Sequence, residues 1–453
     1  MPDLDNANDR RARVLLSAYA CEPLKGSEPG VGWNWVREIS RFAEVWVLTR
    51  ENNRRSIEAA LSAEPMAHAH FVYYDLPRSL TFWKKGGRGV HVYYYLWQAG
   101  AYFVAKELHR KIAFDLIHHA TFASCWFPSF LAFLPVPFVW GPVGGGESTP
   151  GSFWKSFSNR GKLYELLRVL NHWRAQCDPL VRATARRTGF GLATTSETEA
   201  TLRALGCSQT AILSLAAIGN DEVQALRKIP ERLDTPFRVL SVGRLLHWKG
   251  FHLGMEGFAH FHRAHPTSEY WIIGDGAEKH RLRRLASELA IEANVCFWGE
   301  LPRADALQKL GECDVLIHPS LHDSSGWVSI EAMAAGRPVI CLNTGGLALQ
   351  VDEQNGVKIP ATSPQQAVAG ITAAFENLSN DLELRLRYGR ASRARVDCEF
   401  NWARKAQEIR SIYVRLLRNN ALAARSPRID LRGLESKMEM PTYRSDTFRS
   451  GSL

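Results

Sequence analysis

The stretch that decides the fold is residues 315–346, VLIHPSLHDSSGWVSIEAMAAGRPVICLNTGG. A short apolar strand is expected over residues 315–318, followed by a small polar loop and a helix that opens near Trp327. A second apolar strand is expected at residues 338–342. Strand, loop, helix and strand in this order indicate a parallel βαβ unit, and ligands bind beyond the carboxyl ends of such strands.

Two carboxylates in this stretch are candidates for binding. Asp323 lies in the loop and Glu331 lies eight positions later on the helix, so both can face one pocket. Loop amides before a helix N-terminus also attract anions, because their N–H groups are unpaired. For either acid alone the plainer interpretation is favoured, in which Asp323 caps the helix and Glu331 is a surface acid. The whole string, with Pro319, Gly326 and Pro338 in order, is far more specific.

The alternation of strands and helices extends outward in both directions from this stretch. Apolar strands are expected at residues 14–20, 44–49, 71–74, 115–118, 138–140, 191–194, 237–242, 269–273 and 295–298. A polar segment with two prolines, residues 228–236, interrupts the pattern and indicates a linker. The chain is therefore predicted to be an α/β protein with two doubly wound halves and a cleft between them.

Composition excludes several classes of protein. Of the 453 residues, 45% are apolar and 23% are charged, a balance that excludes a disordered or fibrous chain. The eight cysteines have no metal-ligand or redox spacing, which favours a reducing, cytoplasmic compartment. The polar start is unlike a signal peptide, and the most apolar run, residues 92–104, is shorter than the roughly 20 residues needed to span a bilayer.

Residues 319–340 resemble the nucleotide-sugar signature P-S-x-x-[E/D]-x-x-G-x-x-x-x-E-A-M-A-x-G-x-P-V-I of retaining glycosyltransferase family four (group 1), which has the GT-B fold. That family more often has Glu where this chain has Asp323. Residues 14–35 resemble its bacterial polysaccharide-assembly branch. The resemblance implies two facing Rossmann-like domains, an acceptor-binding domain at 1–227 and a nucleotide-sugar-binding domain at 237–401. Residues 402–418 would form a helix that crosses back, and residues 419–453 a disordered tail.

A second motif, FRVLSVGRLLHWKG at residues 237–250, resembles the family's G-R-L…K-G motif. It implies that Arg244 and Lys249 hold the donor diphosphate, where positive charge stabilises a leaving group. Taken alone, two solvated cations are the plainer interpretation. Asp323 would position the sugar and Glu331 the ribose. The other implied donor contacts are Gly299 and Leu301, the amides of Ser325, Gly326 and Trp327, and the glycine loop with Gly30 and Gly32.

The first half offers weaker candidates. Gly30 and Gly32 are explained almost equally well by helix-start geometry. His118 and His119 end a predicted strand, and the resemblance implies that a histidine here contacts the transferred sugar or the acceptor; His119 is favoured, although strand-end histidines are more often structural. Glu147 follows three glycines and is a candidate partner for an acceptor hydroxyl. No carboxylate pair indicates a metal site, so neither metal nor cofactor is expected.

The segment at residues 151–190 has eight basic and two acidic residues. Five aromatic residues are interspersed, namely Phe153, Trp154, Phe157, Tyr164 and Trp173. This composition suits peripheral contact with an anionic lipid surface. A solvated helical face with some core aromatics explains it equally well. No motif for base readout accompanies the cations, so nucleic acid is not an expected partner.

The resemblance implies transfer of a sugar from a nucleoside-diphosphate sugar to an acceptor hydroxyl with retained configuration, the leaving phosphate helping to deprotonate the acceptor. The expected acceptor is a lipid-linked oligosaccharide for capsule, exopolysaccharide or O-antigen synthesis at the inner face of the plasma membrane. A soluble glycan is the second choice. Two other classes stay open, a GT-B-fold sugar-nucleotide epimerase and a non-catalytic scaffold that binds sugar nucleotides. The donor base, the sugar, the linkage and the oligomeric state are not determined by these patterns.

Overall fold

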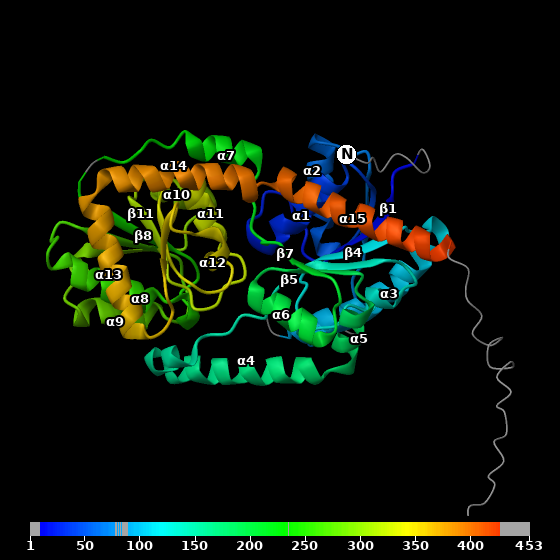
Figure 1. Cartoon of the computed structure of the whole chain (residues 1–453), viewed down its shortest axis with the longest axis horizontal. Helices are drawn as coiled ribbons and strands as arrows, with labels where there is room; N and C mark the ends of the chain where they lie inside the picture. Colours follow the sequence, from blue (N-terminus) through cyan, green and yellow to red (C-terminus); the bar gives the residue numbers. More distant parts are fainter. Residues whose placement is uncertain are drawn as a thin grey trace, which may run out of the picture.

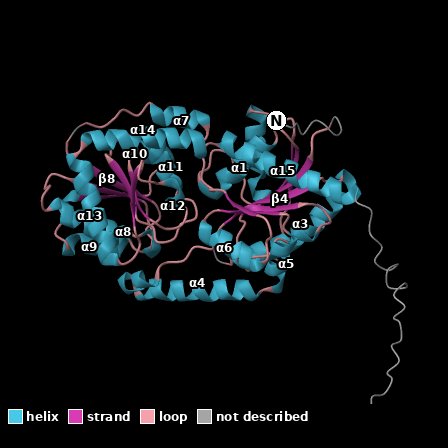
Figure 2. Ribbon diagram, in the orientation of Figure 1, coloured by secondary structure: helices cyan, strands magenta, loops and turns pink. Residues whose placement is uncertain are grey.

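The computed structural model describes residues 10–425, apart from 78, 80, 82, 84–88 and 234. This part of the chain forms two α/β halves side by side, each around a parallel sheet (Figures 1 and 2). The prediction of two Rossmann-like domains is confirmed. Most of the predicted tail, residues 426–453, lies outside the described residues.

The first half contains a seven-stranded sheet with the order β3-β2-β1-β4-β5-β6-β7. Its strands are β1 (Arg13–Ala18), β2 (Glu44–Thr49), β3 (Ala69–Tyr73), β4 (Leu116–Thr121), β5 (Phe138–Val143), β6 (Phe190–Ala193) and β7 (Thr210–Ile212). Its helices are α1 (Ser27–Ile39), α2 (Arg54–Ala63), α3 (Val90–Ile112), α4 (Asn159–Cys177), α5 (Pro179–Arg187) and α6 (Ser196–Leu205). The strand order reverses between β1 and β4, and the loops after those two strands diverge to leave space for a ligand.

The second half contains a six-stranded sheet with the order β10-β9-β8-β11-β12-β13. Its strands are β8 (Arg238–Val242), β9 (Glu269–Ile273), β10 (Val295–Gly299), β11 (Val315–His318), β12 (Val339–Leu342) and β13 (Gly356–Ile359). Its helices are α8 (Phe251–His262), α9 (Lys279–Glu288), α10 (Arg303–Gly311), α11 (Trp327–Ala334), α12 (Leu347–Gln350), α13 (Pro364–Asn380) and α14 (Leu382–Glu399). Here the order reverses between β8 and β11, so the loops after these strands hold the expected ligand site.

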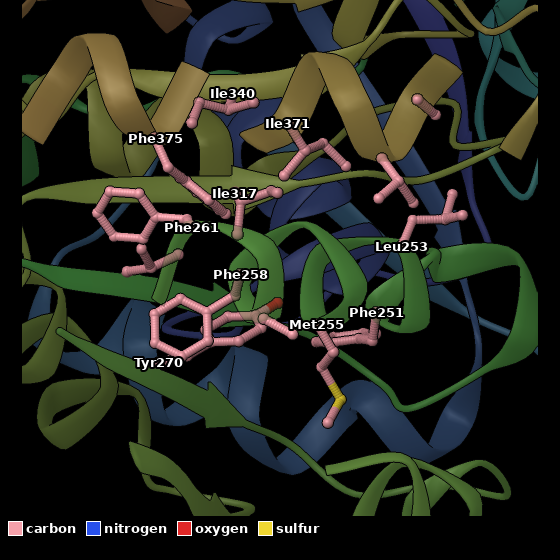
Figure 3. Close-up of a cluster of buried hydrophobic side chains, with 14 of the residues drawn as sticks. Phe251, Leu253, Met255, Phe258, Phe261, Tyr270, Ile317, Ile340, Ile371 and Phe375 are labelled. Carbon is pink, nitrogen blue, oxygen red and sulfur yellow. The ribbon is translucent and has the colours of Figure 1, made fainter. Parts of the chain in front are cut away.

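Each sheet is buried on both faces, which is why its strands are continuous apolar runs. Figure 3 shows one face of the second sheet, where Phe258, Phe261 and Phe375 from the helices pack around Tyr270 and Ile317 from the strands. Helix α7 (Asn220–Arg227), which precedes the linker, packs its buried side chains in the core on the opposite face of this sheet.

Helix α15 (Trp402–Arg425) crosses from the second half back over the first, as predicted (Figure 1). Trp402 lies in an edge-to-face contact with Trp35 of α1, 5.1 Å between ring centroids. Ile409 and Tyr413 are buried in the same core as β1 and β4. The helix extends to Arg425, beyond its expected end at residue 418.

A second crossing was not predicted. After β5 the chain reaches the second half, where Phe153 and Phe157 of the 151–157 segment are buried in the core of the second sheet. Helix α4 then returns to the first half along the lower side of the molecule in Figure 1. Two of the five aromatic residues expected near a lipid surface are therefore core residues that fasten the two halves together.

Candidate functional site

The two points of strand reversal face a common space between the halves. The loop after β5 and the loop after β11 approach closely, since a Cβ on Gly144 would lie 3.1 Å from Ser324 Oγ. A cavity of about 280 Å³ lies here; its lining includes Glu28, Tyr94, Trp126, Arg168 and Ser324. A second cavity of about 290 Å³ lies between the loop before α1 and the start of α11, and its lining includes Lys25, Gly30, Glu222, Arg303 and Trp327.

Lys249 and Asp323 meet at the reversal point of the second sheet. The Lys249 ammonium forms an ion pair with Asp323 Oδ2, and His318 Nε2 lies 3.2 Å from the same oxygen. Burial alone would raise the pKa of Asp323, but the charge of Lys249 and the nearby His318 outweigh it and hold the pKa well below the usual range. The structure therefore brings together one cation and one acid of the predicted set.

Glycine makes this approach possible. Gly250 follows Lys249 with φ 69°, and a Cβ there would lie 2.0 Å from the carbonyl oxygen of Pro319. Any other residue would push the loop after β8 away from the loop after β11. Gly250 thus sets the distance between Lys249 and Asp323.

Arg244 is placed differently. Its side chain is exposed and forms no hydrogen bond or ion pair with another residue in the described part of the chain. Arg244 lies on the same loop after β8 as Lys249 and immediately follows Gly243. A guanidinium in this position is free to take a bidentate anion such as a phosphate.

Glu331 is paired with a residue that sequence reasoning missed. Arg303, at the start of α10, lies 2.5 Å from Glu331 Oε1 and also forms an ion pair with Glu222 of α7. Burial raises the pKa of Glu331, and the charge of Arg303 opposes this rise. Nothing in the sequence indicated that Arg303 contacts Glu331.

The remaining predicted donor contacts lie on backbone. Gly326 precedes α11 with φ 51°, and no side chain caps this helix, so its first amides are open to an anion. Ser325 N lies 3.5 Å from Asp323 Oδ1, and Trp327 packs toward Trp402 of the crossing helix. Gly299 ends β10 with φ 72°, and Leu301, two residues later, packs against the core beneath α11.

Gly30 and Gly32 lie inside α1 rather than in a loop. A Cβ on Gly30 would lie 2.0 Å from the Lys25 carbonyl oxygen, and one on Gly32 would lie 2.1 Å from that of Ala20. Both glycines therefore let the loop after β1 fold closely against the helix. Both glycines are buried, and Gly30 also lines the cavity beside Arg303.

The two histidines on β4 do not reach the space between the halves. His119 is buried, with Nδ1 2.8 Å from Ser129 Oγ and Nε2 3.0 Å from the Tyr94 hydroxyl. His118 is held between the Tyr413 hydroxyl and the Gly141 carbonyl under α15. Burial lowers the pKa of His119 to about 3 and that of His118 to about 4. The expectation that His119 contacts the sugar therefore does not fit its placement, because Tyr94 covers it.

Glu147 is likewise engaged within the first half. Its Oε1 accepts hydrogen bonds from three threonine hydroxyls (Thr194, Thr195 and Thr198) at 3.0–3.3 Å, and its Oε2 accepts one from Gly145 N. With four donors on a buried carboxylate, Glu147 orders the glycine loop and is not placed to bind an acceptor hydroxyl.

Glu28 is the acid of the first half that does line the cavity, and it was not predicted. Its Oε1 accepts a hydrogen bond of 2.7 Å from the Phe122 amide, and burial raises the pKa of its carboxyl group. Phe122 has φ 57°, a strained conformation for a residue other than glycine, and such strain is concentrated at functional sites. The sequence offered only a Glu two residues before the glycines as a signal.

Glu165 joins the returning helix α4 to the donor-side loops. Its Oε1 lies 2.9 Å from His247 Nε2 and 3.2 Å from His322 Nε2. His247 is two residues from Lys249, and His322 is adjacent to Asp323, so this contact orders both loops. Burial alone would raise the pKa of Glu165, but the two histidine hydrogen bonds outweigh it and lower the pKa to about 2.

Replacing Glu165 with Gln should lower the free energy of unfolding at neutral pH by about 2–3 kcal/mol, because a buried network with a charged acceptor is lost. The folded-state pKa lies below the ordinary value of 4.5, so this contribution is complete above that value and is lost as the pH falls from 4.5 toward 2. Thermal unfolding across this range should therefore show a shallower acid limb for Glu165→Gln. Glu383→Gln, at an exposed ion pair with Arg390, is the control and should match the wild type; equal acid limbs for all three proteins would contradict the prediction.

Within residues 10–425, leaving out the undescribed positions, no group of three or more His, Cys, Asp or Glu side chains is placed to hold a metal ion. None of the helices that the structure describes is long and apolar enough to cross a bilayer.

Comparison with known proteins gives the geometry a context. Residues 222–395 match the family model of the glycosyl transferases group 1. Over 180 residues the chain is 32% identical to the glycogen synthase of Mycobacterium tuberculosis, a match that covers 40% of this chain and 42% of that protein. Over 160 residues it is 32% identical to the lipopolysaccharide core biosynthesis glycosyltransferase LpsE of Rhizobium meliloti, covering 34% of this chain and 44% of LpsE. In both cases, less than half of the relative's length is matched.

Solved structures match almost the whole chain in fold. Sucrose-phosphate synthase from Thermosynechococcus elongatus superposes with a TM-score of 0.59 at 19% identity, covering 90% of this chain and all of that chain. The HepE protein of Anabaena, solved with UDP and glucose, gives a TM-score of 0.56 at 18% identity, covering 88% and 99%. The two facing Rossmann-like domains are those of the GT-B fold.

Proposed function

Because residues 222–395 match the family model of the glycosyl transferases group 1, we propose that the protein transfers a sugar from a nucleoside-diphosphate sugar to an acceptor hydroxyl. The observation that carries this proposal is the meeting of Lys249 and Asp323 at the reversal point of the second sheet. Arg244 lies on the same loop as Lys249, and its side chain has no partner among the residues that the structure describes. Cations at this position suit a diphosphate leaving group.

Each residue then has a role that its placement supports. Arg244 and Lys249 bind the diphosphate, and the open amides of α11 add to them. Asp323, ionised at neutral pH, accepts hydrogen bonds from sugar hydroxyls, and the Lys249 contact holds it in place. Glu331 accepts hydrogen bonds from the ribose hydroxyls, either after Arg303 has moved away or while Arg303 still contacts it. The reaction retains configuration: the donor phosphate leaves with the electron pair of the glycosidic bond and takes the acceptor proton on the same face.

The acceptor enters through the cavity between the halves. Tyr94, Trp126 and Phe127 line it, and aromatic faces of this kind stack on sugar rings. Glu28 points into the same cavity and is the group we propose for an acceptor hydroxyl, in place of His119 and Glu147. We further propose that the acceptor is a lipid-linked glycan of a bacterial surface polysaccharide, which the match to LpsE supports.

A thermal-shift screen over UDP-, GDP- and ADP-sugars tests donor binding. A donor at about 100 times its dissociation constant should stabilise the protein by about 2.7 kcal/mol. Arg244→Gln should reduce this shift and leave the unfolding temperature without ligand unchanged, because Arg244 makes no contact that the fold needs. A full shift in Arg244→Gln and in Lys249→Met would contradict the proposed diphosphate site. If the protein converts a nucleotide sugar into its epimer without an acceptor, the activity is epimerisation and the proposed sugar transfer is wrong.

A further inference from the structure

Helix α4 is an amphipathic surface helix whose apolar side faces solvent and whose more polar side faces the protein. The side toward the protein carries Gly161, Glu165 and Ala175, which are buried, and Arg168 and His172, which are half-buried. The side toward solvent is mostly apolar, with Leu163, Leu166, Leu167, Val169, Leu170 and Trp173 each 47–67% exposed. A helix normally buries its apolar side, so this arrangement indicates that something covers α4 in the working protein.

The charges on α4 indicate what covers it. The helix holds one acid, Glu165, which faces inward onto the two histidines. Arg160, Lys162 and Arg174 are exposed beside the apolar residues. An apolar face flanked by cations, without an exposed acid, is complementary to a surface that is apolar inside and negative at its boundary.

The surface next to the end of α4 has the same character. Leu180, at the start of α5, lines a hollow of about 420 Å³ together with Tyr102 and Phe103 of α3 and with Phe130 and Phe133. The lining is almost entirely apolar, and the Phe103 side chain is 68% exposed. Arg187 lies over the Phe133 ring, so a cation borders this hollow as well. A second apolar and basic area therefore follows α4 along the chain.

We propose that α4 lies flat on an anionic lipid bilayer, with Leu163, Leu167, Leu170 and Trp173 at the level of the acyl chains and with the flanking cations among the headgroups. A second copy of the chain fits less well, because two α4 faces packed together would place their cations side by side without an acid to pair them. The inference deepens the proposed function and rests on it only in that the bilayer would carry the lipid-linked acceptor.

Vesicle co-sedimentation of the full chain tests the inference. We expect binding to phosphatidylcholine vesicles that contain phosphatidylglycerol and weak binding to phosphatidylcholine alone. The double variant Leu167→Glu/Leu170→Glu should reduce partitioning by at least about tenfold, because two apolar side chains lose their burial and two negative charges are added. Leu233→Glu is the control, since Leu233 is 63% exposed in the linker rather than on α4, and its replacement should leave partitioning unchanged.

Charge is tested separately. Arg160→Gln/Lys162→Gln should weaken binding to the anionic vesicles and have little effect with phosphatidylcholine, whereas Arg283→Gln/Arg284→Gln on α9 should change neither. Wild-type levels of vesicle binding by the leucine variant would overturn the inference. It would also be overturned if the wild type does not bind vesicles and is a dimer by size-exclusion chromatography, while the leucine variant is a monomer. The donor-induced thermal shift is read in the same variants, so failure of donor binding and failure of membrane binding are distinguished.

Discussion

Replacing Lys249 with Met is expected to lower kcat by about 10²–10³-fold, the typical cost of losing one donor aimed at developing negative charge. Met keeps most of the length of the side chain and removes the ammonium. Lys249 lies on the same loop as Arg244 and contacts Asp323. Without its ammonium group, the leaving diphosphate loses a stabilising positive charge, and the Asp323 side chain is free to move. Steady-state kinetics with the donor identified by thermal shift measure the effect.

The ion pair requires a control for stability, because Lys249→Met also removes the lysine partner of the buried Asp323 carboxylate. Asp323→Asn and the double variant complete a cycle: the double variant should recover part of the lost stability and none of the lost kcat. Lys279→Met removes an equivalent cation from the exposed pair with Asp275 on α9 and should leave kcat unchanged. If Lys249→Met retains kcat and loses only stability, Lys249 is a structural counter-ion, and the proposed diphosphate site is wrong.

Replacing Phe153 with Ala is expected to lower the free energy of unfolding by about 3–5 kcal/mol, the usual cost of deleting a buried phenyl ring. Phe153 belongs to the segment that follows β5, yet its side chain is fully buried in the core of the second sheet. The substitution therefore weakens the contact between the halves as well as one core. Urea denaturation followed by tryptophan fluorescence measures the change.

Phe103→Ala provides the comparison, because Phe103 is 68% exposed on α3 and its loss should change stability by no more than about 0.5 kcal/mol. If Phe153→Ala is as mild as Phe103→Ala, residues 151–157 do not fasten the halves. Two separate unfolding transitions in Phe153→Ala would show that the segment is the main link between them.

Eleven of the thirteen strands that the structure describes were predictable because their signal is local, whereas β7 and β13 were not predicted. A parallel strand that is buried on both faces must be a continuous apolar run, as in residues 315–318, and the loop that follows must carry the polar residues. The family resemblance assigned Lys249 and Asp323 to one site, and the structure brings them into contact at the ends of two neighbouring strands. Glu331 also lies on the predicted helix.

The partners of these residues were not predictable, because each comes from a distant part of the chain. Arg303 reaches Glu331 only when α10 packs beside α11, and Tyr94 covers His119 only when α3 packs over β4. Two adjacent histidines on a strand point to opposite faces of a sheet, so the sequence could not tell that both faces are covered.

The sequence by itself determined the two Rossmann-like halves, because the periodicity of strands and helices is a property of short segments. Its resemblance to a known family implied the crossing helix and the residues proposed for the donor, because a motif is also a property of a short segment. Only the tertiary structure decided which candidates face the space between the halves and that Phe153 and Phe157 lie in the core of the other half. It also decided that α4 presents leucines rather than charges to its surroundings. Burial is the reason: whether a side chain is covered depends on neighbours that are remote in the sequence, and burial sets the pKa, the hydrogen-bond partners and the accessibility of each group.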